Sequence, residues 1–319
     1  MKKNKPVIFV VGSTASGKSE WALRLAQEFH GVIVNCDSVQ VYKKVDIGAA
    51  KPSKAEQALV PHFLLDYVNP PQEMTAGQYS RDFFATLESI PEQTPIFVVG
   101  GTGFYFMAIE KGMYPVLAVP EDIQKEVAAE LQTELGVQKL HQELLEKDPL
   151  YGAKIHLSDH YRLGRAIELI RSQGKSVTQI QKEFAESRSE FPYPLLKMGP
   201  SWDREALKER IDLRTKRMLE AGLIDEVQGL LDEGLEAWAP LSSVGYKETI
   251  VFLKKEVSKE QLFESIATNT RQLAKRQRTW FQRDKEIQWY DGKDGFSQAR
   301  SVVEEFLIPF DPKKGKAGE

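Results

Sequence analysis

The segment Gly12-Ser-Thr-Ala-Ser-Gly-Lys-Ser19 constrains the fold of this chain more than any other stretch, because it matches the phosphate-binding loop pattern G-x-x-x-x-G-K-[ST] at every required position. The apolar run Val7–Val11 precedes it, and apolar residues at helical spacing follow it up to Phe29. A strand, a glycine turn and a helix N-terminus together present backbone N–H groups and a helix dipole to an anion. The sequence therefore predicts an α/β protein that binds a phosphorylated ligand.

Every residue of this loop is a candidate contact for a diphosphate or a nucleotide, and the candidates are Gly12, Ser13, Thr14, Ala15, Ser16, Gly17, Lys18 and Ser19. The Lys18 ammonium adds a positive charge for a terminal phosphate, and the Ser19 hydroxyl can ligate Mg²⁺. We therefore expect Mg²⁺ as a cofactor, with Ser19 as its protein ligand.

Composition bounds the class of protein. The 319 residues are enough for a sizeable core and for two lobes. The net charge of −3 gives no global sign of nucleic-acid binding, so any such surface has to be local. No apolar run approaches the length of a membrane span, and the basic N-terminus leads into a strand rather than a signal peptide. The single cysteine, Cys36, excludes an internal disulfide and a cysteine-based zinc site, so we expect a cytoplasmic protein with no membrane partner.

Strand and helix signals alternate in the first third of the chain. Apolar runs at 7–11, 32–34 and 96–99 predict strands, and helical patterns at 19–29 and 79–89 lie between them. Such alternation is typical of a parallel sheet with helices on both faces, like that of P-loop NTPases. We expect this core to resume with a strand at 195–198 and with helices at 204–221, 224–233 and 259–283.

An acidic stretch rich in Glu and Leu separates the two parts of this core. Helices are expected at 121–146 and 159–185, the second interrupted at Gly174, and Phe191–Pro194 has the composition of a linker. We therefore predict a catalytic core of residues 1–116 and 195–319 and a helical insertion of residues 117–194. The tail from Pro312 onward is expected to be disordered.

Asp37 and Thr102 follow the second and third predicted strands, and ligands of doubly wound sheets bind at this edge. Asp37 could hold Mg²⁺ or act as a general base, but a turn aspartate fits its position equally well. Thr102 lies in Gly100-Gly101-Thr102-Gly103, where an ATPase would often carry an acidic residue. The missing acid disfavours an ATPase and fits a transferase that uses a phosphorylated donor.

Two predicted helices carry basic side chains on one face. Arg162 and Arg165 are three residues apart, so both could clamp one phosphate. Arg271, Lys275 and Arg278 share a face of the most basic stretch of the chain. Such a cluster in an acidic chain suggests contact with a phosphate backbone, and a solvated helix face is the alternative for both groups.

A further basic face combines Arg210, Arg214 and Arg217, and the sequence does not fix which of them reaches a phosphate. The five histidines show no metal-ligand spacing, and the pair His156 and His160 is a weak metal signal by itself. These histidines are therefore interpreted as structural or as facing RNA.

Ordered motifs from the first strand to about Tyr290 resemble the tRNA dimethylallyltransferase family, whose members are also called tRNA isopentenyltransferases. Besides the phosphate loop, the resemblance is carried by Asp37-Ser-Val-Gln-Val-Tyr42, Asp46-Ile-Gly-Ala-Ala-Lys-Pro52, Pro61-His-Phe-Leu-Leu-Asp66, Val99-Gly-Gly-Thr-Gly-Phe-Tyr105, Asp159-His-Tyr-Arg-Leu-Gly-Arg-Ala-Ile-Glu168, Val244-Gly-Tyr-Lys247 and Thr270-Arg-Gln-Leu-Ala-Lys-Arg-Gln277. So many matches in one order are far more specific than the loop alone. The zinc-finger extension of eukaryotic members is absent, so we expect a bacterial-type member.

The resemblance implies the transfer of a dimethylallyl group from dimethylallyl diphosphate to N6 of the adenosine at tRNA position 37, with release of diphosphate. It implies that Asp37 takes the proton from the amine and that Thr102 positions the acceptor. The acceptor base would be extruded from its stack, because a stacked base cannot enter a narrow site. The helical insertion would clamp the anticodon stem-loop, and the chain is expected to act as a monomer.

The tRNA contacts that the resemblance implies come from both expected domains. They are Asp37, Ser38, Val39, Gln40, Thr102, Gln124, Arg162, Arg165, Gly245, Tyr246, Lys247, Arg271, Lys275 and Arg278. Gln124 stands where the family often carries a basic residue, and Ser13 replaces a proline that is common after the first loop glycine.

Two other functions are compatible with the phosphate loop. A small-molecule or nucleotide kinase shares the loop, the missing second acid and an arginine pair in a helical lobe, but it has no need of a basic helix over 271–283. An RNA-binding protein with a nucleotide switch would not depend on Asp37 or Thr102. An incubation with labelled dimethylallyl diphosphate and unmodified tRNA, compared with an incubation with labelled ATP and nucleosides, distinguishes these functions by the substrate that is used.

Overall fold

The computed structural model describes residues 4–113, 119–187 and 190–310. The chain divides into two compact units: one combines Met1–Glu110 with Phe191–Glu319, and the other is Lys111–Glu190. The expected domain boundary at 117 and the expected disordered tail lie outside the described residues.

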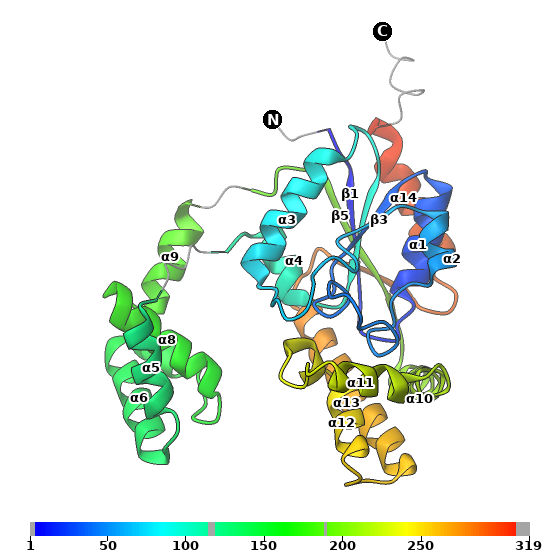
Figure 1. Cartoon of the computed structure of the whole chain (residues 1–319). Helices are drawn as coiled ribbons and strands as arrows, with labels where there is room; N and C mark the ends of the chain where they lie inside the picture. The colour runs from blue at the N-terminus through cyan, green and yellow to red at the C-terminus, as the bar shows by residue number, and fades with distance from the viewer. Residues whose placement is uncertain (1–3, 114–118, 188–189, 311–319) are drawn as a thin grey trace. The chain divides into compact units, whose positions relative to one another are not determined.

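The larger unit is built on a sheet of six parallel strands in the order β3-β2-β4-β1-β5-β6 (Figure 1). In chain order these are β1 Val7–Val11, β2 Val32–Asn35, β3 His62–Phe63, β4 Ile96–Gly100, β5 Leu195–Ser201 and β6 Gln288–Asp291. Every residue of β1 and β4 is buried, as expected for central parallel strands that are covered on both faces. The predicted parallel α/β core is therefore confirmed, whereas β3 and β6 were not predicted.

Helices cover both faces of this sheet. The helices of the larger unit are α1 Lys18–Glu28, α2 Lys54–Leu59, α3 Ala76–Ser89, α4 Gly103–Glu110, α10 Arg204–Glu220, α11 Leu223–Asp232, α12 Tyr246–Leu253, α13 Lys259–Phe281 and α14 Phe296–Leu307. Helices α1 and α14 lie on one face, and α3 and α4 lie on the other (Figure 1). Leu25 of α1 and Val303 of α14 share a buried cluster with Ile8 and Val10, which confirms the layered arrangement.

The segment at 191–194, interpreted above as a linker, belongs to the core of the larger unit. The Phe191 ring lies 5.8 Å from that of Phe9, and Tyr193 is only 1% exposed. The Pro194 carbonyl oxygen accepts a hydrogen bond from Val7 N–H at 3.0 Å. Prolines made this stretch resemble a connection, but its aromatic side chains pack against β1 and lead directly into β5.

The smaller unit is entirely helical in its described part. Its helices are α5 Glu121–Glu130, α6 Glu134–Lys147, α7 Pro149–Gly152, α8 His160–Gln173 and α9 Val177–Ser187. The expected helix over 121–146 is in fact two helices, because the Thr133 hydroxyl caps α6 by accepting from Gly136 N–H at 3.0 Å. The expected interruption at Gly174 is confirmed. Within this unit Arg171 pairs with Glu130 and Glu143, which ties α8 to α5 and α6.

Candidate functional site

The phosphate loop connects β1 to α1, as its sequence predicts. Ala15 and Gly17 have left-handed φ angles of 62° and 90°, which curl the backbone around the start of the helix. The Lys18 ammonium donates back to the Ser13 carbonyl oxygen at 3.2 Å. The Ser16 hydroxyl is buried and has no hydrogen-bond partner among the described residues.

Three side chains from distant parts of the sequence hold this loop in place. Trp202 donates to the Ser16 carbonyl at 2.7 Å, and Arg210 donates to the Ala15 carbonyl at 2.8 Å. The Gln277 side chain accepts from Thr14 N–H at 2.7 Å and donates to the Gly101 carbonyl at 3.0 Å. The backbone N–H group of Thr14 is therefore bonded to the Gln277 side chain.

Sequence reasoning missed Trp202 and Gln277 as site residues. Gln277 lies about two turns beyond Thr270 and one turn beyond Leu273 on α13, and this face of α13 borders the cavity described below. A Cβ atom on Gly101 would lie 2.4 Å from the Gln277 amide nitrogen. The absence of a side chain at Gly101 therefore leaves room for the Gln277 amide group of α13.

Asp37 and Thr102 lie together at the carboxyl edge of the sheet. One Asp37 carboxylate oxygen, Oδ1, accepts from Val39 N–H at 2.9 Å and from Gln40 N–H at 3.3 Å. The Thr102 hydroxyl accepts from Ser38 N–H at 2.9 Å. Asp37 therefore forms the turn that carries Ser38, Val39 and Gln40, while its second carboxylate oxygen has no hydrogen bond within the described ranges.

Two adjoining cavities meet beside Lys18. The first, of about 230 Å³, is lined by Asp37, Val39 and Gln40 and by apolar residues of α1, α10 and α13. The second is a groove lined by the basic face of α10: Arg210, Arg214 and Arg217. Lys18, Ser19 and Arg214 line both cavities, and the region that these three residues border is called the passage below.

The charges around this passage favour an anion. Burial lowers the pKa of Lys18 to about 8, Asp37 opposes that shift, and Arg214 adds to it. Burial also lowers the pKa of Arg214, and Asp37 again opposes the shift. Two cations with one carboxylate leave a positive balance, and a bound anion would stabilise the charged forms of both.

Several predicted RNA contacts have structural partners within the larger unit. Tyr246 is fully buried in this structure, and its contact with RNA stays a prediction. Gly245 is buried at the N-terminus of α12, whereas Lys247 is exposed. The Gln40 side chain donates to the carbonyl oxygens of Ala49 and Ala50, both at 3.0 Å, although it still borders the first cavity.

The three basic residues of α13 differ from one another. Arg271 is half-buried and forms an ion pair with Asp212 of α10 at 2.9 Å. Lys275 and Arg278 are exposed, and no ion pair involves them among the described residues. Lys275 and Arg278 are therefore the side chains of this face that are most available to a polyanion.

The smaller unit carries three of the predicted tRNA contacts, and each has a polar partner inside that unit. Arg162 is exposed beside Asp159, at 3.5 Å, and Arg165 pairs with Glu168 at 2.7 Å. The Gln124 side chain donates to the Val119 carbonyl at 2.7 Å, next to the start of its own helix. Arg162 is thus more accessible to a polyanion than Arg165.

Within the part of the chain that the structure describes, one cluster of acidic side chains lies close enough together to be considered as a metal site. Glu110, Asp284 and Glu286 lie close enough to share a cation, but the Lys197 ammonium already pairs with all three. Across the described ranges, no helix is long and apolar enough to span a membrane.

The fold and the site define a phosphate-loop protein whose bound anion would face a carboxylate across one cavity. A family model described as IPP transferase matches residues 40–284, and the chain belongs to this family. Membership in this family, which is described by its transfer of an isopentenyl group, disfavours the kinase and the nucleotide-switch alternatives.

Curated relatives are similar over nearly their whole length. The chain is 73% identical over 303 residues to a tRNA dimethylallyltransferase of Bdellovibrio bacteriovorus, covering 95% of this chain and 98% of the relative. It is 40% identical to the tRNA dimethylallyltransferase of Synechocystis sp., covering 91% of this chain and 92% of the relative. Both relatives carry the name of the family that the sequence motifs resemble.

Solved structures agree with these matches. The full-length tRNA isopentenylpyrophosphate transferase of Bacillus halodurans has a TM-score of 0.70 at 31% identity, with 98% of this chain and 100% of that chain covered. A eukaryotic dimethylallyltransferase acting on tRNA has a TM-score of 0.81 at 26% identity, with 95% of this chain and 79% of that chain covered. The fold class and the enzyme family predicted from the sequence are thereby confirmed.

Proposed function

We propose that the chain transfers a dimethylallyl group from dimethylallyl diphosphate to N6 of the adenosine at position 37 of tRNA, and that it releases diphosphate. The observation that carries this proposal is the placement of the Asp37 carboxylate in the same cavity as the cations Lys18 and Arg214. The cations suit a departing diphosphate, and the carboxylate suits an amine that loses a proton.

The donor would bind with its diphosphate at the phosphate loop and the basic groove. Lys18 and Arg214 border both cavities, so they are the cations we assign to the diphosphate. Arg210 is engaged with the Ala15 carbonyl and stacks on Trp202 at 4.3 Å, which suits support of the loop. Arg217 borders the basic groove but not the first cavity, and it would neutralise the negative charge on the side of the diphosphate away from Asp37.

The acceptor amine would approach from the side of Asp37. Its nitrogen attacks C1 of the dimethylallyl group while the bond from C1 to the diphosphate oxygen breaks. Positive charge builds on the nitrogen, and its proton passes to the free oxygen of Asp37 and then to solvent. Thr102 supports this geometry through its hydrogen bonds to Ser38, which fix the turn beside Asp37.

Mg²⁺ fits this site as a diphosphate-bound ion. Ser19 is exposed in the first turn of α1 and borders both cavities, and Asp37 borders the first. One hydroxyl and one carboxylate suit an ion that keeps several waters and takes its remaining ligands from phosphates. When bound, it would neutralise charge that develops on the leaving diphosphate.

The RNA would be held by both units. Support comes from the exposed cations Lys247, Lys275, Arg278 and Arg162. We assign the anticodon stem-loop to this surface, with the helical unit as the clamp, and we propose that the chain acts in the cytoplasm as a monomer.

The decisive experiment supplies both substrates together. Purified protein is incubated with labelled dimethylallyl diphosphate and unmodified tRNA, and the modified nucleoside is identified after digestion. We expect label on N6 of the adenosine 3′ of the anticodon. Label on another nucleoside, or transfer that requires ATP in place of dimethylallyl diphosphate, would contradict the proposal.

A further inference from the structure

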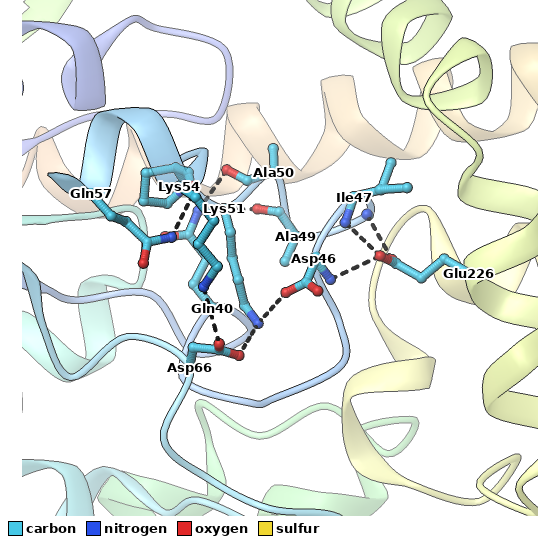
Figure 2. Close-up of polar contacts among 12 residues, drawn as sticks. Gln40, Asp46, Ile47, Ala49, Ala50, Lys51, Lys54, Gln57, Asp66 and Glu226 are labelled. Atoms are coloured by element: carbon cyan, nitrogen blue, oxygen red, sulfur yellow. Dashed lines mark hydrogen bonds and ion pairs between the residues drawn. The ribbon is translucent and has the colours of Figure 1, made fainter.

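A carboxylate outside the catalytic cavity organises the loop that borders it. Glu226 of α11 accepts hydrogen bonds from three successive backbone N–H groups, those of Asp46 at 3.0 Å, Ile47 at 2.7 Å and Gly48 at 3.1 Å (Figure 2). The Tyr246 hydroxyl donates to the same carboxylate at 2.7 Å. Each Glu226 oxygen thus accepts two hydrogen bonds, the arrangement of an anion held in a backbone nest.

The loop that Glu226 holds, residues 46–52, forms a wall common to both cavities. Ala50, Lys51 and Pro52 border the first cavity and also the basic groove. The loop is tied to the Asp37 turn as well, because the Gln40 side chain donates to the Ala49 and Ala50 carbonyls. A shift of this loop would therefore change the donor passage and the catalytic turn together.

Tyr246 completes the same attachment from α12. Its hydroxyl accepts from Ala49 N–H at 3.2 Å while it donates to Glu226. Burial and then the Glu226 charge raise the pKa of Tyr246, so the hydroxyl stays protonated and remains a donor. A Cβ atom on Gly48 would lie 2.4 Å from the Tyr246 ring, so the loop packs directly on this side chain.

We propose that Glu226 is a positioning residue that holds loop 46–52 in the place required for donor binding. The inference rests on the donor site assigned under Proposed function. Four donors converge on the carboxylate, and an amide in its place would leave two of them facing an NH₂ group. Because charge-assisted hydrogen bonds are about twice as strong as neutral ones, loss of the charge should release the loop.

The test is the Glu226→Gln variant, compared with Glu233→Gln as a matched control. Glu233 lies just beyond the end of α11 and pairs with Lys44, which lies just before loop 46–52. This ion pair is exposed, so it serves as the control. We expect E226Q to raise KM for dimethylallyl diphosphate about tenfold, the effect of one lost charged hydrogen bond, with KM for tRNA within about twofold. Amide hydrogen exchange at 46–50 should accelerate in E226Q and stay unchanged in E233Q.

Two outcomes would overturn the inference. Unchanged donor KM and unchanged exchange in E226Q would show that the loop does not depend on Glu226. A lower melting temperature with unchanged donor KM would assign Glu226 to stability alone. Lys18→Ala, measured in parallel, separates the two proposals: if K18A raises donor KM and E226Q does not, only the positioning role fails, and if neither does, the donor site itself is wrong.

The Tyr246→Phe variant tests the shared attachment independently. It removes one donor to Glu226 and the acceptor for Ala49, so we expect a smaller rise in donor KM than in E226Q. The double variant should raise donor KM less than the product of the two single effects, because both residues act on one loop. Independent, multiplicative effects would contradict a common role.

Discussion

At the scale of single residues, the site depends on how charges are divided between two cations and one carboxylate. Lys18 and Arg214 face Asp37 across the cavity, and each cation has its pKa lowered by burial. A bound diphosphate would raise the pKa values of both cations, so anion binding would favour their charged forms. With a pKa of about 8, Lys18 titrates within an accessible range of pH.

Lys18 should make donor binding sensitive to alkaline pH. Its pKa is about 8 in the free protein, so the ammonium is charged below pH 8 and neutral above it. Since the charged form binds the anion, donor affinity should weaken as pH rises through 8, by about tenfold for each further unit of pH. Calorimetric titration with the donor at pH 7 and pH 9 measures this loss. Equal affinity at both values would remove Lys18 from the donor site.

At the scale of elements, α13 combines a structural face with an accessible basic face. Gln277 and Thr270 point toward the cavity, and Arg271 binds Asp212 on α10. Lys275 and Arg278 remain exposed on the face that they share with Arg271. The sequence predicted the shared face from spacing, but the ion pair of Arg271 depends on a residue 59 positions away.

Replacing Lys275 and Arg278 together by Ala should weaken tRNA binding and flatten its dependence on salt. The slope of log affinity against log salt should fall by roughly one for each lost phosphate contact, and therefore by up to about two. Binding titrations at several salt concentrations measure it. Lys259→Ala, at the exposed other end of α13, is the control and should leave the slope unchanged. The same slope in the double variant as in the parent would assign this face to solvent.

The sheet illustrates what local sequence can and cannot predict. The strands at 7–11, 32–34 and 96–99 are predictable because each is a continuous apolar run in the sequence. Strand β3 has only two residues, and β6 is polar and mostly exposed, so neither has a local signature. The side chains that hold the phosphate loop are still harder to predict. Trp202 and Gln277 bond to residues 186 and 263 positions away, and no local sequence pattern encodes such contacts.

At the scale of the whole molecule, the two compact units have separate cores. The cluster around Leu140 and Leu163 lies entirely in the smaller unit, and the cluster around Ile8 and Leu25 lies entirely in the larger one. The ends of the larger unit that flank the smaller one share a core, because Phe106 and Phe191 both pack on Phe9. The smaller unit can therefore be removed without cutting the sheet.

Replacing residues 111–190 by a short Gly/Ser linker should separate donor binding from RNA binding. The phosphate loop, Lys18 and Arg214 all lie in the larger unit, so donor affinity should stay within a few-fold. Loss of the proposed clamp should lower tRNA affinity by at least about tenfold, since each lost phosphate contact weakens binding. Calorimetry for the donor and filter binding for tRNA measure the two affinities. Full tRNA affinity in the shortened chain would contradict the clamp.

The Asp37→Asn variant tests the central claim most directly. An Asn side chain can still accept the hydrogen bonds from Val39 and Gln40 through its oxygen, so the turn is kept and only the charge and basicity are lost. We predict a fall in kcat of roughly 10²-fold or more, the scale of general-base catalysis, with tRNA affinity within a few-fold and a melting temperature close to that of the parent. Near-normal turnover in this variant would reduce Asp37 to a turn residue and contradict the mechanism.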